Sequence, residues 1–174
     1  MLTKADIEKY FLAEKQESLI FLAIGIIAIL LSLIFYSYLK TSFYKGAAVP
    51  LLVIGLIQAM VGYTVYTKSD MQRIGNVYAY DMDPGKLKAE ELPRMKTVNK
   101  NFVIYKWMEI VLFLSGITLI FLYKSDTAKA LWFGLGLTLA IQAGVMLVAD
   151  FFATKRASVY TIQLENFINK GKGT

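Results

Sequence analysis

The chain has 174 residues, of which 56% are hydrophobic and 18% are charged, with a formal net charge of +6 and neither cysteine nor histidine. This composition excludes a disordered protein, a disulfide scaffold and an ordinary soluble domain, because soluble domains are about 45–50% apolar and about 25% charged. The missing residue types also exclude structural zinc sites, thiol nucleophiles and histidine-based acid–base catalysis. We therefore expect an all-α integral membrane protein with no cofactor, no metal and no catalytic site.

Residues 1–16 predict a short amphipathic helix ahead of the first membrane span. Thr3 followed by Asp6 resembles a capping pair. The apolar residues of this segment fall on one helical face, at Ile7, Tyr10 and Phe11. The segment lacks a basic start and a small-residue cleavage site, so it is not a signal peptide. We expect it to lie on the membrane surface, or alternatively to dock on a partner.

Four apolar runs are long enough to cross a bilayer core about 30 Å thick, which needs about 20 mostly apolar residues per helix. They cover residues 18–39, 47–67, 103–123 and 130–153. Helices are the only spanning structure that fits, because lipid leaves open backbone groups unsatisfied and the runs lack a two-residue alternation. We expect one membrane domain, residues 1–174, with the four transmembrane helices in two tandem hairpins.

Residues 68–101 form a polar connection between the second and third spans, which we expect to be partly helical. Ser69 with Gln72 predicts one helix start, and Asp83-Pro84 predicts another, because aspartate caps a helix and proline suits its first position. Exposed aromatic residues with polar neighbours suit contact with a protein partner. The candidate partner-binding residues are Tyr78, Tyr80, Asp81, Met82 and Asp83. The alternative is that these tyrosines pack against the ends of the bundle.

The second and fourth spans carry small residues at four-residue spacing, which lets helix backbones approach closely in lipid. These residues are Gly55 and Ala59 in the second span, and Gly136, Ala140 and Gly144 in the fourth. The pattern predicts that these two helices meet at the centre of the bundle.

A weak internal repeat supports the two-hairpin arrangement. Lys45 precedes Ile57-Gln58 by twelve residues, and Lys129 precedes Ile141-Gln142 by the same distance. Two spans per repeat preserve orientation, so the halves should be related by an axis along the membrane normal. We therefore predict that Gln58 and Gln142 lie close together, either as structural hydrogen-bonding groups or as the lining of a pathway.

Charged residues inside the spans are the strongest functional indication, because each costs about 2.5–3.5 kcal/mol at the centre of a span on insertion scales. Within or beside the spans lie Glu17, Lys106, Glu109 and Asp150. We expect Lys106 to pair with one carboxylate and the other to be solvated or held by Lys155 or Arg156. The cluster fits a structural ion-pair network, a cation or proton site, or a partner contact.

The tail, residues 154–174, predicts a second amphipathic helix. Its apolar face consists of Tyr160, Leu164, Phe167 and Ile168. Fourteen lysines and arginines lie in the two terminal segments and the middle connection, against four in the two remaining turns. The positive-inside bias therefore predicts an inner-membrane protein with both termini and the middle connection in the cytoplasm.

These observations favour a non-enzymatic inner-membrane protein that binds a protein partner, either an immunity-type protein or an accessory subunit of a membrane complex. The alternative is a small oligomeric transporter or channel that uses the intramembrane carboxylates and glutamines. A membrane enzyme is least supported, because no catalytic motif joins the acids, lysines and tyrosines. The basic residues face anionic lipid, so we expect the bilayer and a protein partner or a second copy, and no nucleic acid.

Overall fold

The computed structural model of the protein describes residues 2–170. Its four long helices are α1 (Lys4–Ile34), α2 (Ser42–Met82), α4 (Leu92–Tyr123) and α5 (Ala130–Lys170). Short helical turns join or extend them, namely η1 (Phe35–Leu39), α3 (Pro84–Lys86), η2 (Leu87–Glu91) and η3 (Thr127–Lys129). Each long helix, with its extension, is long and apolar enough to cross a membrane. The prediction of an all-helical protein with four helices long and apolar enough to span a membrane is confirmed for the described residues.

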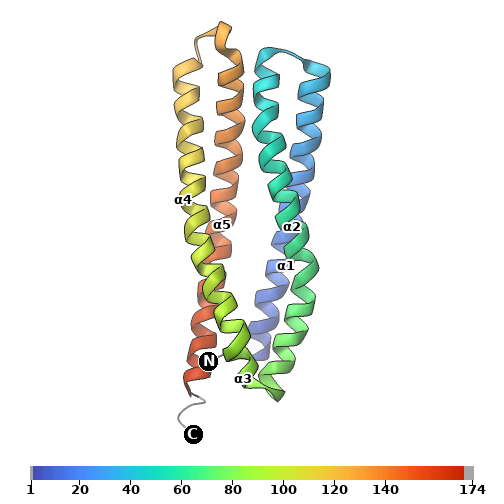
Figure 1. Cartoon of the computed structure of the whole chain (residues 1–174), viewed down its shortest axis with the longest axis vertical. Helices are drawn as coiled ribbons and strands as arrows, with labels where there is room; N and C mark the ends of the chain where they lie inside the picture. The colour runs from blue at the N-terminus through green and yellow to red at the C-terminus, as the bar shows by residue number, and fades with distance from the viewer. Residues whose placement is uncertain (1, 171–174) are drawn as a thin grey trace.

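The helices pair as α1 with α2 and α4 with α5, and α2 lies against α5. Figure 1 shows both chain ends and α3 at one end of the molecule, and the two tight turns at the other. Helices α2 and α5 have 41 residues each, which corresponds to a length of about 61 Å. That is about twice the thickness of a bilayer core. The molecule therefore has two parts along its axis.

We call these parts the apolar half and the polar half. The apolar half consists of residues 18–67 and 103–153, and the polar half consists of residues 2–17, 68–102 and 154–170. Eight of the nine ion pairs in the described chain have both partners in the polar half. Charged pairs at this density belong in water, so the polar half extends beyond the lipid.

Two predicted helix starts are confirmed. The Thr3 hydroxyl accepts a hydrogen bond from the Asp6 backbone N–H, and the Asp6 carboxylate accepts one from the Thr3 N–H, which completes a capping box. The Asp83 side chain accepts from the Lys86 N–H, with Pro84 at the first helical position. These pairs satisfy backbone donors that a helix leaves free at its first turn.

The predicted start at Ser69 is wrong, because Ser69 lies inside α2. Its side chain is buried and its hydroxyl donates to the Val65 carbonyl at 2.9 Å. Helix α2 continues without a break to Met82, and most of the predicted loop 68–101 is helical. Residues 4–16 of the predicted first segment likewise belong to α1 and form no separate helix at the surface. Hydropathy predicts only the part of a helix that lies in lipid. The helix itself ends where a capping residue or a proline stops it.

The apolar half packs through glycine. In the first hairpin a Cβ on Gly25 would lie 2.7 Å from the Gly55 carbonyl oxygen, and in the second a Cβ on Gly116 would lie 2.8 Å from that of Gly136. Gly55, Gly136 and Ala140 thus pack within their own hairpins and not between α2 and α5, which corrects their expected role. Helices α2 and α5 do meet, through Gly46 against Leu131 and Gly134 against Phe43.

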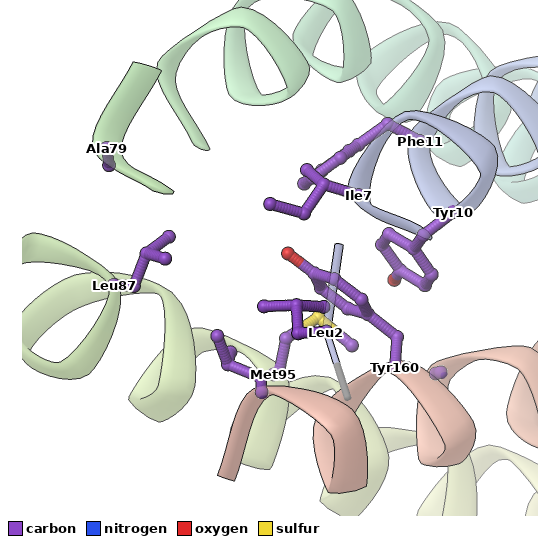
Figure 2. Packing of buried hydrophobic residues seen from close by; sticks show 10 residues of the cluster. Leu2, Ile7, Tyr10, Phe11, Ala79, Leu87, Met95 and Tyr160 are labelled. Carbon is purple, nitrogen blue, oxygen red and sulfur yellow. The ribbon is translucent and has the colours of Figure 1, made fainter. Parts of the chain in front are cut away.

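The polar half has the side-chain core of a soluble helical bundle (Figure 2). Its members come from every long helix and from the connection, and they are Leu2, Ile7, Tyr10, Phe11, Ala79, Leu87, Met95, Ala157, Tyr160 and Leu164. Tyr10 of α1 stacks on Tyr160 of α5, with ring centroids 4.3 Å apart. The apolar faces that were expected on the membrane surface or on a partner therefore pack against one another. Residues 171–174 of the predicted tail lie outside the described residues.

Candidate functional site

The carboxyl groups of Glu109 on α4 and Asp150 on α5 lie close to each other. Glu109 is only 2% exposed, and its Oε2 atom makes no hydrogen bond with the described residues. The two helices bring these side chains together where the apolar half approaches the polar half. The structure therefore joins two of the predicted cluster residues directly.

Lys106 does not pair with either carboxylate, which makes the predicted Lys106 ion pair wrong. Among residues 2–170 it makes no ion pair, although it lies one turn from Glu109 on α4. Lys106 lines a cavity of about 470 Å³ together with Asp150, Thr154 and Lys155. Sequence spacing predicted Lys106 as the charged neighbour of Glu109. The charged group close to Glu109 is instead the carboxyl group of Asp150 on α5.

Glu17 has its own counter-ion. Arg156 of α5 forms an ion pair and a hydrogen bond with Glu17 of α1. The sequence predicted Arg156 as a partner for Glu109 or Asp150, and the structure gives it to Glu17 instead. This pair ties the first helix to the last at the boundary between the two halves.

Gln58 and Gln142 are both buried, but neither makes a hydrogen bond through its amide nitrogen or oxygen within the described chain. The Gln58 Cβ faces α1, 3.0 Å from the position that a Cβ on Gly25 would occupy. No amide–amide hydrogen bond joins the two glutamines, so this form of the predicted pairing is wrong. The six residues of the predicted cluster thus do not form one site. Within the described residues they form a carboxyl pair, an ion-paired Glu17, a Lys106 without an ion pair, and two glutamines whose amide groups make no hydrogen bond.

The five candidate partner-binding residues lie at the end of α2, and most of their polar groups have partners inside the molecule. The Tyr80 hydroxyl donates to the Leu2 carbonyl at 3.2 Å, and its ring stacks on Phe167. Asp81 pairs with Lys4 at 2.6 Å. Asp83 caps α3. The alternative that the tyrosines pack on the bundle end is therefore correct for Tyr80.

Tyr78 and Met82 are exposed, and they belong to a longer line of exposed apolar residues that sequence reasoning missed. Met71, Ile74, Tyr78 and Met82 are 71%, 63%, 65% and 70% exposed, respectively. We call these four residues the α2 stripe. Steps of three and four residues place them on one face of the helix. The same spacing, read along the polar segment, is the signal that could have found the stripe.

The other face of this part of α2 holds a buried polar network that the sequence did not predict. The Glu14 carboxylate accepts hydrogen bonds from the Tyr10 hydroxyl at 3.0 Å and from the Ser69 hydroxyl at 3.2 Å. Burial is the main reason that the pKa of Glu14 lies above its ordinary value. Arg94 makes two hydrogen bonds of 2.7 Å to Glu91, which is 4% exposed. None of these hydrogen bonds involves a residue of the α2 stripe.

Comparison of the chain with protein-family models, with characterised proteins and with solved structures finds no match in any of the three.

Proposed function

We propose that this chain is a non-enzymatic, multi-pass protein of the inner membrane that acts by binding a protein partner. An immunity-type protein or an accessory subunit of a membrane complex works in this way. The observation that carries the proposal is the α2 stripe, which presents four apolar side chains in the polar half. The basic residues of that half favour a cytoplasmic position for it and for both termini.

The stripe suits a protein partner better than lipid. Charged residues surround it at the same level of α2, where Asp70 pairs with Arg73 at 3.6 Å and with Lys15. Such ion pairs need water around them. The stripe spans twelve residues of helix, about 16 Å from first to last, which matches the anchor spacing of a helix that docks in a groove. Two of its four residues are methionine, whose flexible side chain adapts to a partner surface.

The experiment is site-specific photo-crosslinking in cells, with a photoreactive residue in place of Tyr78. We expect a discrete crosslinked product that contains this chain and one protein partner. The matched position is Ile162 of α5, which is also an exposed apolar residue of the polar half and should give no such product. Crosslinks to lipid alone at position 78 would contradict the proposal.

The double substitution Ile74→Glu and Tyr78→Glu tests the energetic role of the stripe. Both side chains are exposed, so the folded protein should keep its thermal stability while it loses the partner in co-purification. Ile162→Glu provides the matched control, since it adds a charge at a similarly exposed site outside the stripe. Retention of the partner by the double variant would contradict a role for the stripe.

A second candidate function is a proton or cation site in a small oligomeric transporter or channel. The carboxyl pair of Glu109 and Asp150 favours it, because two acids this close repel unless a proton or cation lies between them. Purified protein in liposomes should then admit protons down a gradient, reported by an internal pH dye. Glu109→Gln and Asp150→Asn should abolish the flux and leave a folded protein, while Gln16→Ala should not. Equal flux with empty liposomes would remove this candidate.

We also propose that the two hairpins are tandem copies related by an axis along the membrane normal. The equal spacing from Lys45 to Gln58 and from Lys129 to Gln142 supports this, because it places a lysine and a glutamine at matching positions of the two hairpins. Cysteines at positions 58 and 142 test the proximity that the repeat predicts, because the native chain has no cysteine. A crosslink in membranes supports the repeat, and lipid-facing positions on opposite sides would contradict it.

A further inference from the structure

One side of the α4–α5 hairpin carries a long groove. It consists of the cavity of about 470 Å³ at Lys106 and Lys155 and of a second cavity of about 580 Å³ closer to the turn. Its lining residues on α4 are Lys106, Ile110, Phe113, Ile117 and Ile120. On α5 they include Ile141, Gly144, Val148, Phe151 and Lys155. Steps of three and four residues keep each set on one helix face, so the two cavities form one groove about 21 Å long.

The groove is polar at one end and apolar along the rest. Lys106, Thr154 and Lys155 line the end toward the polar half. Neither lysine makes an ion pair with any residue from 2 to 170. Asp150 lines the same end, but its carboxyl lies close to that of Glu109 on α4. Two ammonium groups and a hydroxyl therefore remain for a negatively charged ligand.

The polar end lies at the level of lipid headgroups. Trp107, which follows Lys106, is an exposed residue of α4, and tryptophan concentrates at the membrane–water interface. Lysine side chains near a helix end extend toward the same layer. From there the groove runs about 21 Å into the apolar half, which exceeds the roughly 15 Å of hydrocarbon in one leaflet.

We propose that this groove binds one anionic phospholipid from the leaflet on the side of the polar half. The phosphate lies between Lys106 and Lys155, and one acyl chain follows the groove past Phe113. A free phosphate would use the lysines but leave the apolar length empty. A partner helix would bury both lysine charges without a counter-charge, at a high desolvation cost. Basic sites between helices at this level are a recurrent way to hold anionic headgroups.

The test uses the full chain purified in mild detergent and supplied with phosphatidylglycerol or phosphatidylcholine of identical acyl chains. Native mass spectrometry counts the lipids that each chain retains. We expect one retained phosphatidylglycerol per chain and clearly less phosphatidylcholine. Lys106→Gln and Lys155→Gln should each weaken retention about fivefold, and the double variant should remove the preference. Lys124→Gln, at the turn end of α4, should leave the retention unchanged.

A second variant tests whether the acyl chain contributes to binding in addition to the headgroup. Gly144→Phe fills the floor of the groove and keeps both lysines, so it should lower retention of phosphatidylglycerol while thermal unfolding without lipid stays near that of the parent chain. Equal retention of the two lipids would overturn the proposal. So would tighter retention of phosphatidylethanolamine, unchanged retention in the double lysine variant, or full displacement by inorganic phosphate.

Discussion

The two halves of the molecule are held together by different chemistry. In the apolar half, helix backbones touch through Gly25, Gly55, Gly116 and Gly136, and exposed side chains face lipid. In the polar half, large side chains such as Phe11 and Tyr160 fill the space between helices, and ion pairs cover the outside. The same four helices pass through both halves. Lipid offers no hydrophobic drive to helix association, so close backbone contact replaces the buried core there.

The largest expected effect comes from a buried charge in the polar half. Arg94→Leu leaves the Glu91 carboxylate, which is 4% exposed, without its partner, and should destabilise the protein by about 3–5 kcal/mol. Thermal unfolding in mild detergent measures this loss. The double variant Glu91→Leu and Arg94→Leu should recover most of it, because no charge then remains buried. If the double variant is as unstable as the single one, packing and not charge explains the loss.

The corresponding test of the apolar half is Gly134→Ala. The added Cβ would overlap the Phe43 carbonyl oxygen on α2, so the two hairpins must separate at a cost of about 1–3 kcal/mol or more. Gly144→Ala is the matched control, since its Cβ would lie 3.5 Å from the Phe113 ring in ordinary contact. The same unfolding measurement compares the two variants. Equal stability of both would show that α2 and α5 do not depend on this close approach.

The polar half should respond to pH through Glu14. Burial raises the pKa of Glu14 above its ordinary value of 4.5, so the folded chain holds this proton more tightly than the unfolded chain. The stability that this provides is full below pH 4.5 and is lost as the pH rises through the raised pKa. Glu14→Gln should therefore gain stability relative to the parent chain as the pH rises, measured as unfolding temperature at several pH values.

Asp70→Asn should change the pH dependence of stability in the opposite direction, and it serves as the control for Glu14→Gln. The Lys15 ammonium, which donates a hydrogen bond to Asp70, lowers the pKa of this carboxyl below 3.8. Its contribution is present above that value and is lost as the pH falls. Asp70→Asn should therefore be less stable than the parent chain at pH 7 and approach it in acid. Parallel pH profiles for the two variants would contradict this account.

The smallest expected effect lies in the turn between α1 and α2. Lys40 has a φ of 54°, a left-handed conformation that costs a residue with a Cβ about 1–2 kcal/mol. Lys40→Gly removes this cost but adds freedom to the unfolded chain, so a net gain below about 1 kcal/mol is expected. Lys45→Gly, inside α2, should instead lose about 1 kcal/mol. Unfolding temperatures that fall equally in both variants would exclude strain at Lys40.

Sequence reasoning predicted the four spans and two helix starts, because hydropathy and capping are local properties. The residues 18–39 and 103–123 all lie within helices that cross the apolar half. Sequence reasoning failed where the result depends on which side chains of two neighbouring helices face each other. Lys106 is the fourth residue of its run and lies one turn from Glu109, but only the packing of α4 on α5 decides that Glu109 lies close to Asp150. The α2 stripe was missed because exposure of Met71 and Ile74 requires knowledge of what covers them.

The core of the polar half draws its side chains from distant points along the chain, with Phe11 from the first helix and Tyr160 and Leu164 from the last. During synthesis, the first hairpin enters the membrane well before α5 leaves the ribosome. Until then Ile7 and Phe11 have no partner from α5 and remain exposed to water or to chaperones. Biogenesis therefore separates into two stages, in which the hairpins insert one after the other and the polar half closes last.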